Sequence, residues 1–240
     1  MNLFSRIIGI ITGFFTARGS ADIISQGNSP APGGGAGSSN SSASDTVSNA
    51  AKSDFDESRI LQDYSVTQKW HNGWKRTLDQ INEVVIHHTA GTGNIETLKK
   101  WMLTGERKEQ YMKGISLFHF AIDRDGKIWK AGPISRWWYH SCSGKHDRFT
   151  VGIENIHKTG PFTDAQYDAL SWLLFEYMHH FCPDFSRIVS HDYNYNTYSN
   201  MKKGCPGPDF DWDRLEQEMT KRSITFETHG FEEYTIKFPA

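Results

Sequence analysis

From about residue 60 onward, apolar positions recur along the chain with two different periods. Short apolar runs rich in β-branched residues predict strands over residues 83–88, 151–156 and 187–190. Two further extended segments, residues 116–122 and 127–130, flank an Asp-Gly pair. Because Asp-Gly between alternating segments is a strong turn signal, these two segments predict a hairpin.

The clearest helical spacing of apolar residues follows Pro161. Thr163 and Gln166 have the spacing of a capping box, Phe162 stands where a hydrophobic staple would, and Pro183 ends the helix. The stripe that we expect to face the core consists of Tyr167, Leu170, Leu173, Leu174, Tyr177, Met178 and Phe181.

Two shorter helices are predicted over residues 95–103 and 209–219, and residues 221–240 are expected to add a strand or to form a tail. The folded domain is therefore expected to span residues 58–220. Because its strands alternate with helices, the fold class is α/β.

The first 57 residues have a different composition. Residues 1–21 hold an apolar run, residues 7–15, which is shorter than the roughly 20 residues that a membrane-spanning helix needs. A cation precedes the run and small residues follow it, which is the outline of a signal peptide; an anchor at the membrane surface is an equal alternative. Residues 22–57 are rich in Gly, Ser and Pro and predict a flexible linker.

Composition narrows the classes of function. The formal net charge is −2, so no overall positive field favours nucleic acid, and we expect no nucleic-acid partner. Fifteen Phe, nine Tyr and eight Trp suit both a core and a groove for sugar or peptide, and the segment 137–139 is a candidate for either role. Three cysteines argue against a framework built of disulfides alone, and the states of Cys142 and Cys182 stay open.

A cysteine in a turn-rich loop is the main chemical signal. Cys205 lies between Lys-Gly and Pro-Gly-Pro, where proline fixes φ and glycine permits unusual angles. Together with His191 and one histidine of the pair His87-His88, it supplies three zinc ligands and leaves a fourth position open, as in catalytic zinc sites. Successive strand side chains point to opposite faces, so only one histidine of the pair can face this site.

Five segments of the chain, in this order, resemble one family. They read Val-Ile-His-His-Thr-Ala-Gly, Leu-Phe-His-Phe-Ala-Ile-Asp-Arg-Asp-Gly, Val-Gly-Ile-Glu, Ser-His-Asp and Lys-Gly-Cys-Pro-Gly-Pro-Asp-Phe-Asp-Trp. Over residues 80–218 the chain is similar to the zinc-dependent N-acetylmuramoyl-L-alanine amidases of type 2 and the peptidoglycan recognition proteins, a superfamily that includes phage endolysins. The resemblance implies a central mixed sheet flanked by helices, with one Zn²⁺ in a surface groove.

The same resemblance implies roles for individual residues. The zinc ligands would be His87, His191 and Cys205. Glu154 matches the general base, and Lys203 matches the basic residue that stabilises the oxyanion. The positions expected to line the substrate groove are His119, His140 and Trp138. The segment 192–202 is longer than the usual spacing between ligands in the family, and we expect it to form a loop that reaches over the groove.

Three functions follow from these residues as alternatives. The first is a zinc amidase that cuts between N-acetylmuramic acid and the L-alanine of the stem peptide, and the second is a peptidoglycan-binding protein without catalysis on the same fold. The third is a peptidase with a Cys/His nucleophile. The expected partner is bacterial peptidoglycan, and the expected state is a monomer that is exported, associated with the envelope or carried in a phage particle, with membrane association through residues 1–21.

Overall fold

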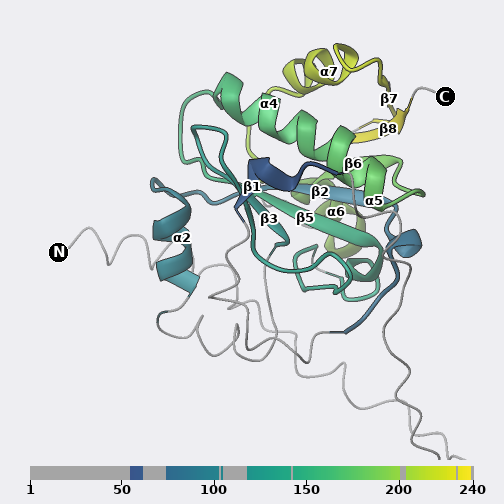
Figure 1. Cartoon of the computed structure of the whole chain (residues 1–240), viewed down its shortest axis with the longest axis horizontal. Helices are drawn as coiled ribbons and strands as arrows, with labels where there is room; N and C mark the ends of the chain where they lie inside the picture. The colour runs from purple at the N-terminus through teal and green to yellow at the C-terminus, as the bar shows by residue number, and fades with distance from the viewer. Residues whose placement is uncertain are drawn as a thin grey trace, which may run out of the picture. The chain divides into compact units, whose positions relative to one another are not determined.

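The computed structural model describes residues 55–61, 74–102, 104, 118–141, 143–200, 204–230 and 232–238. Within these residues, eight strands form one sheet in the order β1-β4-β3-β5-β2-β6-β8-β7 (Figure 1). The strands are β1 (Ile60–Leu61), β2 (Glu83–His88), β3 (Phe120–Ile122), β4 (Ile128–Lys130), β5 (Thr150–Asn155), β6 (Arg187–Ser190), β7 (Thr225–Thr228) and β8 (Glu233–Lys237). The strands predicted from the apolar runs are thus present.

The sheet is mixed, as expected. The four central strands β3, β5, β2 and β6 are parallel. Strand β4 is antiparallel to β3 and parallel to β1, and β8 is antiparallel to both β6 and β7. The antiparallel pairing of β3 with β4 confirms the predicted hairpin. Because parallel strands end at the same edge of a sheet, side chains at the ends of β2, β5 and β6 lie close together, and such edges commonly hold ligand sites.

Helices flank the sheet (Figure 1). They are α2 (Ile95–Met102), α4 (Asp164–Trp172), α5 (His179–Phe181), α6 (His191–Ser199) and α7 (Trp212–Thr220), with a π-helical segment, η5 (Leu173–Met178), joining α4 to α5. Short 3₁₀ helices lie at η2 (Glu57–Arg59), η3 (Leu78–Gln80) and η4 (Asp147–Phe149). The predicted capping box is confirmed, since the Gln166 N–H donates to Thr163 Oγ1 over 3.1 Å and the Thr163 N–H donates to Gln166 Oε1 over 3.1 Å.

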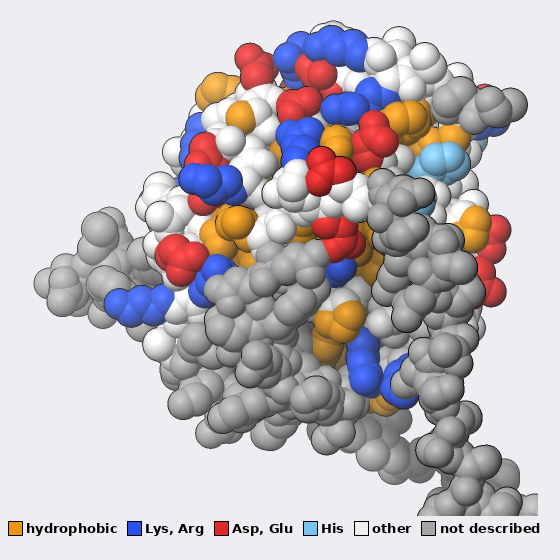
Figure 2. Space-filling model, viewed as in Figure 1, with side chains coloured by type: hydrophobic (Ala, Val, Ile, Leu, Met, Phe, Trp, Pro, Cys, Tyr) orange, Lys and Arg blue, Asp and Glu red, His pale blue; other side chains and the backbone are white. Residues whose placement is uncertain are grey.

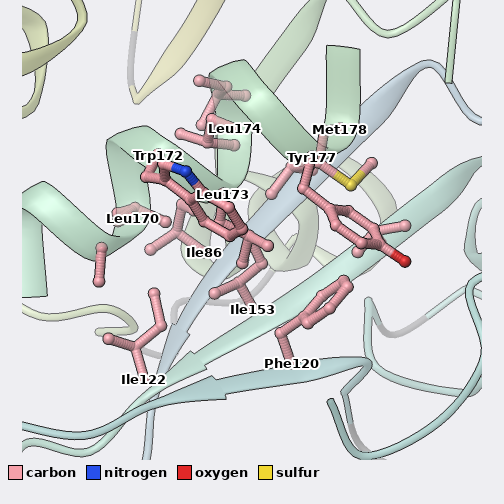
Figure 3. Close-up of a cluster of buried hydrophobic side chains, with 14 of the residues drawn as sticks. Ile86, Phe120, Ile122, Ile153, Leu170, Trp172, Leu173, Leu174, Tyr177 and Met178 are labelled. Carbon is pink, nitrogen blue, oxygen red and sulfur yellow. The ribbon is translucent and has the colours of Figure 1, made fainter. Parts of the chain in front are cut away.

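One face of the sheet forms the main core. Alternate residues of the central strands, Val84 and Ile86 in β2 and Val151 and Ile153 in β5, are fully buried there against the helix that contains α4 and η5. Figure 3 shows the helix residues Leu170, Trp172, Leu173, Leu174, Tyr177 and Met178 above Ile86, Phe120, Ile122 and Ile153. The stripe predicted from helical spacing is therefore core, and the strands alternate between the two faces of the sheet.

The other face of the sheet carries a smaller core and the candidate site. Helix α2 packs its buried Leu98 and Met102 there against Ala121, Trp129 and Trp138. Val85 and His87 of β2 also point to this face, because they alternate with Val84 and Ile86.

The N-terminal end of the expected domain differs from the prediction, and the C-terminal end follows the strand alternative given for residues 221–240. Phe55, assigned by composition to the linker, packs against the main core, with its ring centroid 5.8 Å from that of Tyr177. At the C-terminal end, β7 and β8 add two strands beside β6, so residues 225–237 extend the sheet instead of forming a tail. The expected signal-like segment and most of the expected linker lie outside the described residues.

The described surface carries intermingled charges. On the face in Figure 2, basic and acidic side chains alternate over the described part, in keeping with the small net charge. Among the described residues, no helix has both the length and the apolar character that a membrane span requires.

Cys182 is a free, fully buried thiol, and burial raises its pKa to about 12. Cys142 lies outside the described residues.

Candidate metal centre

The three residues expected to bind zinc lie together. His87 is near the end of β2, His191 is the first residue of α6 directly after β6, and Cys205 lies in the loop before α7. One ligand atom from each lies within 4.8 Å of the other two. Four-coordinate zinc, with bonds of about 2.0–2.3 Å, needs ligand atoms roughly 3.3–3.6 Å apart, so small side-chain movements suffice to fit the ion.

The backbone ties the Cys205 loop to the start of α6. The Asp192 N–H donates to the Cys205 carbonyl over 2.8 Å, and the Gly204 N–H donates to Asp192 Oδ1 over 3.1 Å. Gly204 and Gly207 have φ values of +61° and +93°, which glycine adopts without strain. Two of the expected ligands, His191 and Cys205, therefore reach the site as one connected unit.

His88 faces away from the three ligands, as the alternation of strand side chains predicts. Its ring lies 6.1 Å from that of His157, and a Cβ on Gly207 would stand 3.7 Å from His88 Cε1. Its backbone still contributes, because the His88 N–H donates to Cys205 Sγ over 3.4 Å.

The electrostatics suit a metal better than a free nucleophile. Burial, reinforced by the neighbouring His191, holds the pKa of His87 well below its usual value, so the ring is neutral as a metal ligand must be. Burial also raises the pKa of the Cys205 thiol well above its usual value, and the charge of Glu154 adds to this effect. A thiol of raised pKa is a poor nucleophile, which counts against the Cys/His peptidase.

Glu154 stands beside the first ligand. It pairs in register with His87 across the parallel strands β5 and β2, so both side chains point to the same face of the sheet. The side chain is half-buried, and burial raises the pKa of its carboxyl to about 8. A carboxyl with such a pKa can accept and release a proton near neutral pH. Lys203 lies outside the described residues.

His140 lies behind His87 instead of lining a groove. Its Nδ1 is 3.2 Å from His87 Nε2, its Nε2 is 3.0 Å from Thr150 Oγ1, and its side chain is inaccessible to solvent. The ring rests on the backbone of Gly152, where an added Cβ would stand 2.8 Å from His140 Nδ1. The structure thus places His140 as a buried neighbour of an expected metal ligand, where its ring presents no surface to a substrate.

His119 also lies beneath the site, with its side chain fully buried. The Gly152 N–H donates to His119 Nδ1 over 3.0 Å, so Nε2 carries the proton and faces the Arg136 carbonyl at 3.0 Å. Arg76 Nη2 lies 3.0 Å from the same Nε2. The buried Arg76 guanidinium donates to the carbonyls of Ile134, Asp147, Arg148 and Thr150.

This buried Arg76 fastens the segment 134–150, which carries His140, to the rest of the domain, and burial lowers its pKa to about 9. Trp138 of the same segment is fully buried beside α2, so it presents no ring surface to a substrate. Neither Arg76 nor Thr150 belongs to a recognisable local motif, so the sequence alone gives no signal for their roles.

The segment expected to form a loop over the groove is mostly helix α6. Ser190 caps its start by accepting from the Tyr193 N–H over 2.8 Å, and Asn200, with φ of +51°, caps its end. Ser190 before the helix and Asn200 after it are both residue types that signal helix ends, and they identify the helix in retrospect. The Asn, Tyr and Thr residues between them have modest helix propensity and hide it.

Comparison with known proteins identifies a family and a shared fold. Residues 77–208 match the model of a family described as N-acetylmuramoyl-L-alanine amidase. The Ph2119 endolysin from the Thermus scotoductus MAT2119 bacteriophage has 18% identity and a TM-score of 0.51, covering 67% of this chain and 98% of its own. The N-acetylmuramoyl-L-alanine amidase LysC from Clostridium intestinale URNW has 17% identity and a TM-score of 0.48, covering 67% and 97%. The likeness to the Ph2119 endolysin shows a shared fold. A search of curated proteins found no match.

Proposed function

The chain belongs to the N-acetylmuramoyl-L-alanine amidase family, and from this premise we propose that it is a zinc-dependent peptidoglycan hydrolase. It cleaves the amide bond between the lactyl group of N-acetylmuramic acid and the L-alanine of the stem peptide. The observation that carries this proposal is the grouping of one ligand atom each from His87, His191 and Cys205 within 4.8 Å, with Glu154 in register beside His87.

The zinc would be held by His87, His191 and Cys205. Because His87 Nε2 faces His140 at 3.2 Å, Nδ1 is the ring nitrogen left for the metal. In that state the His87 Nε2–H donates a hydrogen bond to His140 Nδ1, and the His140 Nε2–H in turn donates one to Thr150 Oγ1 over 3.0 Å. This chain of donors fixes the tautomer and orientation of His87, a task that partners behind a metal ligand commonly perform.

A zinc ion with three protein ligands supplies an activated water near neutral pH and polarises a carbonyl. Glu154 then has two tasks. Its carboxylate takes a proton from the attacking water and returns it to the nitrogen of the departing amine, so that one water and one amide give a carboxylic acid and an amine. Lys203, two residues before Cys205, stabilises the oxyanion in this proposal, a contribution worth about 3–4 kcal/mol per donor in comparable sites.

The setting belongs to the proposal as well. The substrate is the bacterial cell wall, which a monomer exported to the envelope or carried in a phage particle reaches. Residues 1–21 would direct export or associate with the membrane, and the Gly/Ser/Pro-rich residues between residue 22 and Phe55 would tether the folded domain.

The test is digestion of purified peptidoglycan by the full chain, followed by mass spectrometry of the released ends. Free stem peptides that begin at L-alanine, lost with a chelator and restored by zinc, are the expected products. Glu154→Gln should abolish cleavage while retaining zinc, whereas Cys205→Ala should lose both. Glu216→Gln, at an exposed position of α7, is the matched control and should cleave normally.

The alternative function predicts a different result. A peptidoglycan-binding protein without catalysis would bind the wall and release no products with or without zinc. That outcome, obtained with zinc-loaded protein, would refute the hydrolase.

A further inference from the structure

Three aromatic side chains form a cluster at the surface of the domain. The rings of Trp74 and Trp137 stack with centroids 4.2 Å apart and an interplanar angle of 13°. Tyr139 stands nearly perpendicular to both, with centroid distances of 5.2 and 5.5 Å. Trp74 is 47% exposed and Tyr139 is 40% exposed, whereas Trp137 is 6% exposed. We call these three residues the aromatic platform; Trp137 supports it, and Trp74 and Tyr139 present it to solvent.

The backbone holds the aromatic platform in place. The Trp137 N–H donates to the Trp74 carbonyl over 3.2 Å, and Lys75 and Arg136 form an antiparallel bridge between the same two segments. Tyr139 is seated against Gly144, where an added Cβ would lie 3.0 Å from its Cε1. A surface ordered in advance in this way loses little conformational entropy when it binds a partner.

The aromatic platform lies on the same stretch of chain as the metal centre. Along residues 137–140, Trp138 and His140 are buried, and His140 contacts His87. Tyr139 between them is exposed. One short segment therefore carries the aromatic platform on its outer side and the partner of a metal ligand on its inner side.

A cation accompanies the rings. The guanidinium carbon of Arg148 lies 5.6 Å from the Trp137 ring centroid, and the side chain is exposed. The described residues include no carboxylate in an ion pair with Arg148. An exposed aromatic cluster, with a cation beside its supporting ring Trp137 that no described carboxylate pairs with, suits a ligand that combines an apolar face with a carboxylate.

We propose that the aromatic platform and Arg148 bind the glycan strand of peptidoglycan, with a sugar ring stacked on Trp74 and a lactyl carboxylate paired with Arg148. This proposal rests on the proposed amidase function in one respect. Hydrolysis of each amide leaves a carboxylate on the muramic acid, so the strand gains the charge that Arg148 recognises. The aromatic platform then retains the enzyme on strands that it has already stripped.

The experiment measures binding of the full chain to soluble glycan strands that lack stem peptides, by calorimetry. Such strands contain no bond for the amidase to cut, so binding is separated from hydrolysis. Trp74→Ala should raise the Kd about tenfold or more, as is typical for an aromatic anchor, and Trp74→Leu, which keeps an apolar side chain, should also bind weakly. Phe149→Ala is the matched control, because Phe149 lies in the segment 134–150, is 43% exposed and is outside the aromatic platform.

A second comparison tests the charge. Oligomers of N-acetylglucosamine, which lack the lactyl carboxylate, should bind the wild type weakly and be unaffected by Arg148→Ala, whereas the same change should weaken binding of the stripped strands. Unchanged Kd values in both Trp74 variants, or no binding of stripped strands by the wild type, would overturn the proposal. Strand binding by a chain that cuts no peptidoglycan would instead reject the amidase and leave the aromatic platform intact.

Discussion

Replacing His140 tests the chain of hydrogen bonds behind the metal centre. In His140→Leu the buried His87 Nε2–H of the metal-bound state loses its acceptor, now 3.2 Å away. In the metal-free protein His87 can move its proton to Nδ1, so the penalty falls mainly on the metal-bound state. A buried donor without a partner costs about 1–3 kcal/mol, which weakens zinc binding by roughly 5- to 150-fold.

A conservative variant separates this effect from packing. In His140→Asn the side-chain oxygen stands near the former Nδ1 and can still accept from His87, so the zinc affinity should stay close to that of the wild type. Zinc affinity is measured by competition with a chromophoric chelator, and folding is monitored by circular dichroism. Tyr139→Phe, a change on the outer side of the same segment, is the control. A folded His140→Leu protein that binds zinc as tightly as the wild type would refute the role of His140.

Three further changes have defined outcomes. Gly152→Ala would place a Cβ 2.8 Å from His140 Nδ1, so zinc affinity should fall about tenfold or more, whereas Gly91→Ala, with its nearest neighbour at 3.7 Å, should not change it. Burial raises the pKa of Asp147 to about 6, above its unfolded value of 3.8. Because ionisation of this carboxyl opposes folding, the stability that it contributes falls as the pH rises from about 4 to about 6. Asp147→Asn keeps an acceptor for two backbone N–H groups but has no carboxyl to ionise. As the pH rises from 4 to 7, the unfolding free energy of the variant minus that of the wild type should therefore increase by about 2–3 kcal/mol. Parallel pH profiles of the two proteins would contradict this. Leu174→Ala, at a fully buried position, should lower the free energy of unfolding in denaturant by about 2–5 kcal/mol, and the exposed Leu61→Ala by much less; equal losses would refute the assignment of the core.

Local patterns predicted the parts of the fold that depend on local physics. The strand at residues 83–88 and the capped helix after Thr163 appear where their sequences indicate, because apolar periodicity and capping act over a few residues. The residue types alone suggest that Cys205, His191 and one histidine of the pair His87-His88 meet. The choice of His87 comes from the family resemblance, since spacing along the chain does not show which side chains meet.

The remaining features depend on tertiary packing. Nothing in the segment 137–140 distinguishes an inward His140 from an outward Tyr139 until Gly152 and Thr150 are placed beneath it. Arg76 reads as an ordinary surface cation in sequence, yet four backbone carbonyls accept from it in the interior. Buried polar groups of this kind are satisfied by partners far away in sequence, so local patterns do not report them.

The register of β2 decides whether His87 or His88 faces His191 and Cys205. Its residues are buried on both faces of the sheet, so the apolar run alone does not decide whether His87 or His88 enters the metal centre. A slip of one residue would turn His88 toward His191 and move Val84 and Ile86 out of the main core. The burial of Val84 and Ile86 in the main core and the contact of His140 with His87 both oppose such a slip. The same packing that stabilises the sheet therefore fixes which histidine of the pair lies beside His191 and Cys205.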